Sequence, residues 1–326
     1  MKRIIIILNI IIATATTACS QQEIANKTWT DGDVEYEVHK KNNTLLFYGA
    51  NVSIVKYGFA LNKQENGEMV ISEMQNEAIE YYCVEEYIGC TVKYKVLNGQ
   101  ELLILRNSKG ILVDILTVGK ADEMRTSALV RCLAGTYADK NGKTYTFSAD
   151  SPRASGFGGS ERYTVERECY TPNFSISFED NKSYLVVGEW NTDDETGVKL
   201  RFEPYNKNDE IECYPEETKQ SIKTKKTKWD SNVANKTIPG RYPYTSTRVM
   251  TRSELMVFII DKLDNMRNEI FARHGQIFKT ARYNDYFNAQ PWYKGTVDDA
   301  TGLLSEIERL NVEQIKAVEA IFKNSN

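Results

Sequence analysis

Residues 266–275 read MRNEIFARHG, the pattern of an amphipathic helix that ends abruptly. Glu269 and Arg273 stand four residues apart, in the favourable order for a helical ion pair. Arg273 and His274 lie in the last turn, where positive charge suits the helix dipole. Gly275 then supplies the left-handed residue that ends the helix. One face is apolar, because apolar residues recur at helical spacing at Leu263, Met266, Ile270 and Phe271.

The run RNEIFARHG at 267–275 resembles the signature of the YARHG domain, a short helical module of bacterial extracytoplasmic proteins. The resemblance covers roughly residues 250–322, and Phe271 stands where the family usually has tyrosine. It implies an extracellular or periplasmic setting and no defined reaction. Its structural motif comprises Arg267, Asn268, Glu269, Phe271 and Gly275. Outside the motif it rests on Ile277-Phe278, Tyr286-Phe287, Trp292-Tyr293 and the run from Leu304 to Glu308.

The C-terminal part, residues 250–326, is expected to be a small all-α domain. Its helices are too short to be stable alone, so their aromatic side chains must share one core. Capping boxes predict three helix starts, at Thr251 with Glu254, Ser305 with Glu308, and Asn311 with Gln314.

The charged end of the motif has two interpretations. In the structural one, which the pattern favours, Arg267, Glu269 and Arg273 bond loop carbonyls and carboxylates, while His274 donates to the backbone at the helix end. In the functional one, a groove binds an anionic or carbohydrate polymer such as peptidoglycan, because arginine suits carboxylates and aromatic rings suit sugar faces. That groove would be lined by Arg273, His274, Trp292 and Tyr293.

The N-terminus has the pattern of a secretory signal peptide at residues 1–18: a basic start, a short apolar run and a small-residue junction. Cys19 follows Thr16-Thr17-Ala18, which resembles the relaxed lipobox of Bacteroidetes lipoproteins. We therefore expect lipidation of Cys19, a tether at 19–25, and an outer-membrane lipoprotein that faces the periplasm or the cell surface. The alternative is an ordinary cleaved signal followed by a chance cysteine.

Residues 26–214 contain many short apolar or alternating segments separated by turn signals such as Asn66-Gly67, Asn98-Gly99 and Asn141-Gly142. They predict antiparallel β modules at 26–120 and 128–214, each a lipocalin-like barrel or sandwich; a single large sandwich is the alternative. The aromatic side chains are expected to fill the interiors rather than enclose a ligand. The Lys/Thr-rich stretch 215–249 is expected to be an exposed linker.

The chain has 326 residues, a net charge of −4 and only two histidines, which disfavours a histidine-rich metal site and nucleic-acid binding. Six cysteines leave an odd number after Cys19. The spacing of Cys83 and Cys90 would allow a disulfide across a hairpin. Cys169 and Cys213 both lie at strand-like ends of the second module, and Cys132 would be left over.

Taken together, the sequence predicts an α+β multidomain protein with antiparallel β modules before a small all-α domain. We expect a lipid-anchored, non-catalytic binding or scaffolding protein without cofactor or metal. Its partners would be the membrane, through the N-terminal lipid, and peptidoglycan or an envelope protein. The alternative is an envelope hydrolase that uses carboxylates of the β region.

Overall fold

The structure is a computed structural model. It describes residues 21–324 except 33, 51–55, 75–80, 83–84, 122–133, 149–152, 157–162, 168–173, 179–183, 188–197, 203–209, 216–221, 230–236, 257 and 259.

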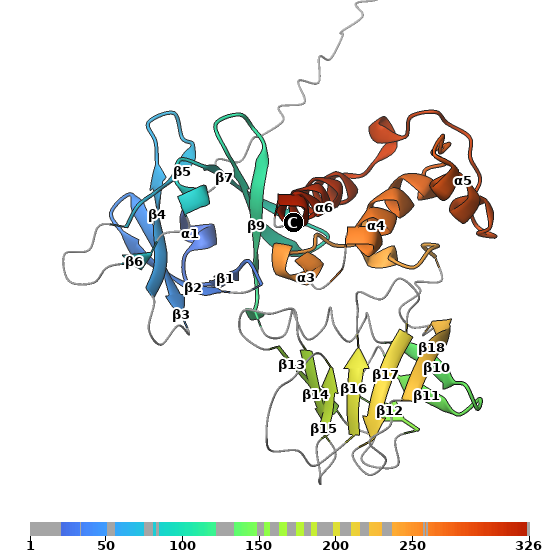
Figure 1. The fold of residues 1–326 in the computed structure, drawn as a ribbon. Helices are drawn as coiled ribbons and strands as arrows, with labels where there is room; N and C mark the ends of the chain where they lie inside the picture. Colours follow the sequence, from blue (N-terminus) through green and yellow to red (C-terminus); the bar gives the residue numbers. More distant parts are fainter. Residues whose placement is uncertain are drawn as a thin grey trace, which may run out of the picture.

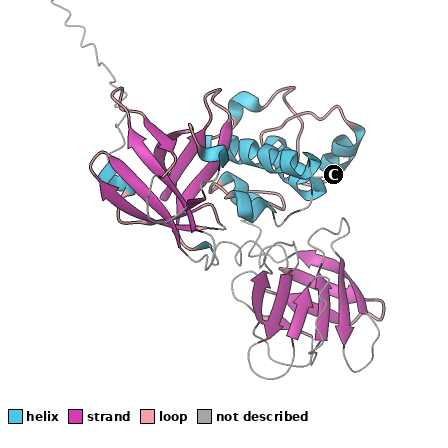
Figure 2. Cartoon of the chain, turned by 60° about the vertical axis from the view of Figure 1, so that its left-hand side comes forward, coloured by secondary structure: helices cyan, strands magenta, loops and turns pink. Residues whose placement is uncertain are grey.

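Eight antiparallel strands close into a barrel in the N-terminal region, as the sequence predicts (Figures 1 and 2). The pairing runs β3-β2-β1-β9-β8-β7-β5-β4, and the β3–β4 pairing closes the circle; the two-residue strand β6 (Tyr81–Tyr82) adds in parallel to β4. The bounds are β1 Thr28–Thr30, β2 Glu35–Lys41, β3 Thr44–Ala50, β4 Lys56–Lys63, β5 Met69–Ser72, β7 Thr91–Leu97, β8 Gln100–Arg106 and β9 Leu112–Val118.

Side chains fill the barrel interior. Its core is made of inward-facing residues that alternate along the strands, with a large aromatic share. Phe47 and Phe59 stack with their ring centroids 4.3 Å apart. The short helix α1 (Gln21–Ile24) packs against this core, and Trp29 Nε1 donates to the Ile24 carbonyl at 2.9 Å. The largest fully buried aromatic residues of this core are Trp29, Tyr36, Phe47, Phe59 and Tyr87.

The second group of strands forms two further sheets. One has the order β12-β11-β10-β18-β17-β16 and the other the order β13-β14-β15. Their bounds are β10 Gly135–Asp139, β11 Thr144–Phe147, β12 Ala154–Ser155, β13 Tyr163–Arg167, β14 Phe174–Phe178, β15 Tyr184–Val187, β16 Val198–Phe202, β17 Glu210–Pro215 and β18 Ile222–Trp229.

Strand β18 corrects the prediction of a linker at 215–249. This strand pairs with β10 on one side and β17 on the other, although its sequence is rich in lysine and threonine. Both edges of this strand pair with a neighbouring strand, so its backbone hydrogen bonds are satisfied despite its polar side chains. The linker prediction was wrong because it relied on composition alone. The C-terminal part of that stretch, from Arg241, belongs to the helical region, where Tyr242 and Val249 are buried.

The C-terminal helical region contains four α-helices: α3 (Arg252–Met256), α4 (Ile260–Arg273), α5 (Ala281–Asn288) and α6 (Glu306–Asn324). Two 3-10 turns, η2 (Pro243–Ser246) and η3 (Thr301–Leu303), complete it; the remaining 3-10 turn, η1 (Glu85–Tyr87), belongs to the barrel. Asn311 and Gln314 do not start a helix, which corrects the third capping box: both lie within α6 and are fully buried. Among the described residues, no helix combines the length and apolar character needed to cross a bilayer.

The helical region packs directly on the outer face of the barrel, next to β9 (Figure 1). The sequence Leu102-Leu103-Ile104-Leu105 explains this packing, because a strand that is apolar at consecutive positions is buried on both faces. Leu103 and Leu105 point into the barrel. The outward-facing cluster joins Leu102, Ile104, Leu112 and Ile115 of the barrel to Val249, Ile307 and Leu310 of the helical region.

Candidate functional site

Helix α4 ends as the motif predicts. Gly275 has φ +79°, its N–H donates to the Ala272 carbonyl at 3.0 Å, and the Gln276 N–H reaches the Phe271 carbonyl at 3.2 Å. This pair of bonds is a Schellman ending. A Cβ on Gly275 would lie 2.3 Å from Thr296 Oγ1, so both backbone conformation and space call for glycine here.

Glu269 and Arg273 form an ion pair that is almost completely buried, with side-chain exposures of 2% and 5%. The Glu269 carboxylate accepts the N–H groups of Arg241 (2.8 Å) and Tyr242 (2.7 Å). Gly240 has φ +108°, and a Cβ there would lie 2.3 Å from Glu269 Oε1. Burial raises the pKa of Glu269, and the charge of Arg273 and the two backbone N–H groups oppose that rise.

The Arg273 guanidinium binds the same loop from the other side. It donates to the carbonyls of Pro239 (2.8 Å) and Tyr242 (2.7 Å) and to the hydroxyls of Thr245 (3.0 Å) and Ser246 (2.9 Å). The ion pair therefore ties the loop 239–246 to α4. This geometry supports the structural interpretation of the motif, with loop carbonyls and a carboxylate as partners.

His274 joins α4 to α6. Its Nε2 lies 2.8 Å from Glu308 Oε2, and Ser246 Oγ donates to Glu308 Oε1 at 2.6 Å. Glu308 also completes the predicted capping box, accepting the Ser305 N–H at 2.8 Å while its own N–H reaches Ser305 Oγ at 3.2 Å. The expected hydrogen bond from His274 to the backbone is thus replaced by a bond to a carboxylate, because α6 starts beside the end of α4.

Arg267 and Asn268 act within the helices as well. Arg267 Nε donates to Glu319 Oε1 of α6 at 3.0 Å, and its Nη2 contacts Asp264. Asn268 Nδ2 donates to the Asp264 carbonyl at 2.8 Å. Arg267 thus links α4 to α6, and Asn268 bonds to the preceding turn of α4 itself.

Trp292 and Tyr293 lie in an aromatic cluster centred on Phe278 and Phe287, whose rings stack with centroids 4.7 Å apart. Tyr293 Oη donates to the Gln276 carbonyl at 2.7 Å. Phe271 is partly buried and packs against this cluster. A phenyl ring can therefore take the place of the tyrosine ring that is usual in the family. The described contacts do not bring Trp292 or Tyr293 against the guanidinium of Arg273 or the ring of His274.

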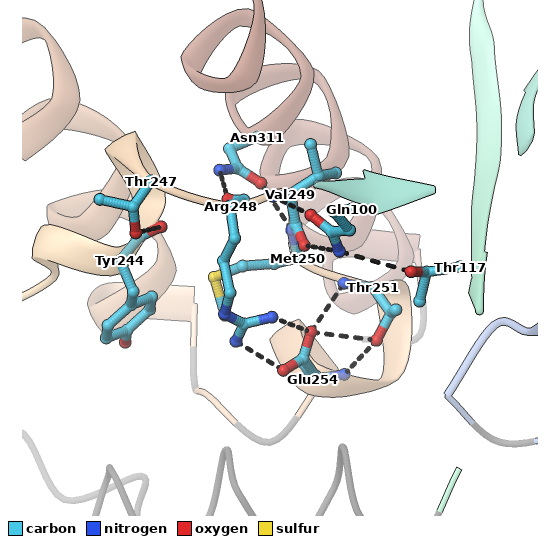
Figure 3. A network of polar contacts seen from close by, with 10 residues as sticks. All are labelled: Gln100, Thr117, Tyr244, Thr247, Arg248, Val249, Met250, Thr251, Glu254 and Asn311. Carbon is cyan, nitrogen blue, oxygen red and sulfur yellow. Dashed lines mark hydrogen bonds and ion pairs between the residues drawn. The ribbon is translucent and has the colours of Figure 1, made fainter. Parts of the chain in front are cut away.

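A polar clamp holds the helical region to the barrel beside the apolar cluster. The side-chain amide of Gln100 in β8 pairs with the Val249 backbone in both directions, at 2.8 and 2.9 Å (Figure 3). Asn311 of α6 accepts the Met250 N–H at 2.8 Å and donates to the carbonyls of Arg248 (2.8 Å) and Thr245 (2.7 Å).

The clamp extends to the first helix of the helical region. Glu254 of the predicted Thr251–Glu254 capping box accepts hydrogen bonds from both terminal guanidinium nitrogens of Arg248, Nη1 and Nη2 (Figure 3). Gly32 of the barrel approaches α3 so closely that a Cβ would lie 1.9 Å from Ser253 Oγ.

Asp114 is a buried charge of this interface, with 1% exposure. Its carboxylate accepts the Tyr87 hydroxyl from the barrel at 2.6 Å and the Gln314 amide from α6 at 3.0 Å, and Arg252 Nε of α3 lies 3.2 Å away. Burial raises the pKa of Asp114, and the Arg252 charge opposes that rise. The sequence analysis did not identify Asp114 as a site residue. The signal was present, because a single aspartate inside the apolar run 111–118 indicates a buried polar site.

A groove of about 690 Å³ runs along the junction of the two regions. Its floor is β7, one wall is the end of the β4–β5 hairpin, and the other is the start of α6. None of Arg273, His274, Trp292 and Tyr293 lines it. The lining includes Glu68, Met69, Lys93, Lys95, Ile104, Arg106, Glu306 and Leu310.

The cysteine predictions fall mainly on undescribed residues. Cys19 and Cys83 lie outside the described residues, and Cys90 is a buried, free thiol whose Sγ lies 3.4 Å from the Glu86 carbonyl. The disulfide predicted between Cys83 and Cys90 stays a prediction, because Cys83 lies outside the described residues. Cys90 instead packs in the barrel core beside η1. The described residues contain no group of three His, Cys, Asp or Glu side chains placed to hold a metal ion.

Replacing Glu308 with glutamine is expected to reduce the loss of stability in acid. Burial raises the pKa of Glu308, but hydrogen bonds from Ser246, the Ser305 N–H and His274 outweigh it, so the net shift is downward. A carboxylate with a lowered pKa in the folded state contributes stability above its unfolded pKa of about 4.3 and loses it as the pH falls through the folded pKa.

Urea unfolding at pH 7 and at steps below pH 5 tests this expectation. The Glu308→Gln variant should lose roughly 1.5–3 kcal/mol at pH 7, the range for hydrogen bonds to a charged group, and show a shallower decline below pH 4.5 than the wild type. Glu313→Gln, on the same helix and 40% exposed at its side chain, is the matched control. Parallel pH curves for wild type and Glu308→Gln would contradict the assignment.

Comparison with known families agrees with this geometry. The model of the YARHG domain matches residues 241–320. No curated protein and no solved structure matches the chain. The match begins at Arg241, within the loop 239–246 that Glu269 and Arg273 hold, rather than near residue 250 as the sequence suggested. Residues 241–320 of this chain therefore form a YARHG domain.

Proposed function

We propose that this protein is a lipid-anchored, extracytoplasmic binding or scaffolding protein that engages a cell-envelope partner without catalysing a reaction. The YARHG domain suggests an extracellular or envelope-associated protein. The N-terminal sequence supports attachment to the outer membrane through Cys19, and the tether at 19–25 then leads into the barrel.

One observation carries the binding role: the barrel and the YARHG domain are joined into a single body that forms a groove at their junction. Such junctions between modules are common places for ligand sites. The barrel interior is filled by its aromatic core, so the surface, and not the mouth of the barrel, is the part that faces a partner. An envelope protein fits this groove better than a glycan, because its described lining combines paired charges with aliphatic side chains and a single tyrosine.

The Trp292-Tyr293 pair remains the candidate contact for peptidoglycan. Both side chains are partly buried in the aromatic cluster, so each exposes only part of its ring. Arg273 and His274 make contacts inside the helical region, so we do not propose that they bind a ligand.

Fractionation and retention assays test the proposed function. Full-length protein should sediment with the outer membrane and take up labelled palmitate, and Cys19→Ser should abolish both. Purified Cys19→Ser protein, linked to beads, should retain at least one purified envelope component, either sacculi or a solubilised outer-membrane protein. Trp292→Ala should reduce retention on sacculi if Trp292 contacts peptidoglycan, and it should leave retention of a protein partner unchanged. Tyr48→Ala, on the barrel surface, is the control.

Two results would overturn the proposal. The first is retention no higher than that of an unrelated lipoprotein for every envelope component. The second is release of soluble sugar or peptide from sacculi by the purified protein, which would mean an envelope hydrolase.

A further inference from the structure

The chain joins the barrel almost directly after the cysteine that we propose carries lipid. Gln21, the first residue of α1, is buried, and its Nε2 donates to the Asn43 carbonyl in the β2–β3 turn at 2.7 Å. Ile24 is fully buried in the barrel core, and its carbonyl accepts the indole N–H of Trp29 at 2.9 Å. Most of the stretch expected to be a tether, residues 19–25, is therefore part of the fold.

The free chain between a lipid on Cys19 and the barrel is correspondingly short. Only Ser20 separates Cys19 from Gln21 in the sequence, and two residues span at most about 7 Å when fully extended. A free tether of the seven residues 19–25 would reach up to about 24 Å. A lipid on Cys19 thus holds α1 and the β2–β3 turn next to the lipid head groups.

Two lysines occupy the barrel surface at this point. Lys40 and Lys41 end strand β2 and lead into the turn at Asn42 and Asn43, and all four residues are exposed. Neither lysine forms an ion pair with a residue that the structure describes. The charged residues of α1 and this turn are the two lysines and Glu23, so two positive charges and one negative charge give a net charge of +1. Lysines beside a lipid anchor strengthen attachment to anionic head groups.

We propose that the barrel docks directly on the bilayer through α1 and the β2–β3 turn, with Lys40 and Lys41 against the phosphate groups of phospholipids. The short anchor fixes the point of attachment, and the two lysines limit the tilt of the barrel about that point. This inference rests on the proposed lipid attachment and adds the orientation of the protein on the membrane.

The β8–β9 turn lies at the far end of strand β9 from α1. β9 begins at Leu112, directly after that turn, and ends at Val118, which pairs with Trp29 beside α1. Its seven residues span roughly 23 Å at the rise of a β-strand. The docked barrel therefore has the β2–β3 turn at the membrane and the β8–β9 turn away from it.

The test uses the protein purified with its lipid and reconstituted into vesicles of phosphatidylethanolamine and phosphatidylglycerol. A donor fluorophore is attached through an unnatural amino acid at Asn42 or at Lys109, one exposed residue in each turn, and an acceptor is carried by a lipid head group. Energy transfer should place the label at Asn42 closer to the acceptors by at least roughly 10 Å, about half the length of β9. Sedimentation with the vesicles checks attachment in every sample.

An insertion addresses the short anchor. Ten Gly/Ser residues placed between Ser20 and Gln21 should keep the protein on the vesicles but remove the difference between the two labels, because such a linker spans roughly 17 Å. The same ten residues added after Asn326 are the matched control and should leave the difference unchanged. Circular dichroism confirms that both proteins are folded.

A charge reversal addresses the lysines. Lys40→Glu combined with Lys41→Glu should at least halve the difference between the two labels, because the barrel then tilts about its anchor. Lys279→Glu combined with Lys294→Glu, an equal change of charge at exposed positions of the YARHG domain, is the matched control and should leave the difference unchanged.

The inference is overturned by any of three results: equal energy transfer from the two labels in the unmodified chain, an undiminished difference after the insertion before Gln21, or an undiminished difference after the reversal at Lys40 and Lys41. Each of these results, in protein that still sediments with vesicles, leaves the proposed function standing. Failure to take up labelled palmitate or to sediment would instead remove the proposed lipid attachment, and the docking with it.

Discussion

Replacing Arg273 with alanine is expected to destabilise the protein by roughly 3–5 kcal/mol, the range for breaking a buried ion pair from one side. The substitution leaves the Glu269 carboxylate, on a side chain that is 2% exposed, without its charged partner. It also removes the donor that holds the carbonyls of Pro239 and Tyr242 and the hydroxyls of Thr245 and Ser246. Burial would then raise the pKa of Glu269 with less opposition.

Urea unfolding followed by circular dichroism measures this effect. Arg273→Lys should recover only part of the stability, because one ammonium cannot reach all the acceptors that the planar guanidinium bonds. Arg282→Ala, at a residue of α5 whose side chain is 48% exposed, is the matched control and should change stability by less than about 1 kcal/mol. A loss below 1 kcal/mol for Arg273→Ala would show that the motif arginine has another role.

Asp114→Ala is expected to cost a similar roughly 3–5 kcal/mol and to loosen the YARHG domain from the barrel. The change leaves the Arg252 guanidinium, the Tyr87 hydroxyl and the Gln314 amide without their shared acceptor. Arg252 keeps its contacts with Glu86 and the Val113 carbonyl, so α3 stays bound to the barrel while α6 loses its hydrogen bond to Asp114. The apolar cluster and the ion pairs of Lys95 with Glu306 and of Arg106 with Glu313 then hold α6 against the barrel, without the bond to the buried carboxylate.

Hydrogen exchange measured by mass spectrometry reports this loosening directly. Peptides from α6 should exchange faster in Asp114→Ala, whereas peptides from β2 and β3 should change less. Asp114→Asn keeps the shape of the side chain and should fall between the alanine variant and the wild type. Asp298→Ala, at an exposed loop position, is the control. Equal exchange of α6 in the alanine variant and the wild type would mean that Asp114 does not hold the interface.

Local signals in the sequence predicted the elements well. The periodicity before Gly275 gave helix α4 and its ending, and two of the three capping boxes form at Thr251 and Ser305. Alternating strands with Asn-Gly turns gave an antiparallel barrel, and Asn98-Gly99 forms the expected two-residue turn. These features depend on neighbouring residues, so a single sequence contains the information for them.

Long-range contacts were the part that local signals could not supply. The partners of Arg273 lie up to 34 residues away, and Asp114 meets Gln314 across 200 residues. Asn311 looked like a helix cap because asparagine is frequent there, but tertiary contacts with the loop 245–250 placed it inside a buried helix. Strand β18 was missed because pairing on both edges outweighed its polar composition.

Native-state hydrogen exchange of β8 and α6 in the wild-type protein tests the central claim most directly, that the barrel and the YARHG domain form one body. The shared apolar cluster, the Gln100–Val249 clamp and Asp114 predict that amides of 102–105 and 307–318 exchange through the same opening, with equal free energies. Exchange of the α6 amides through a separate opening, several kcal/mol lower in free energy while β8 stays protected, would contradict it.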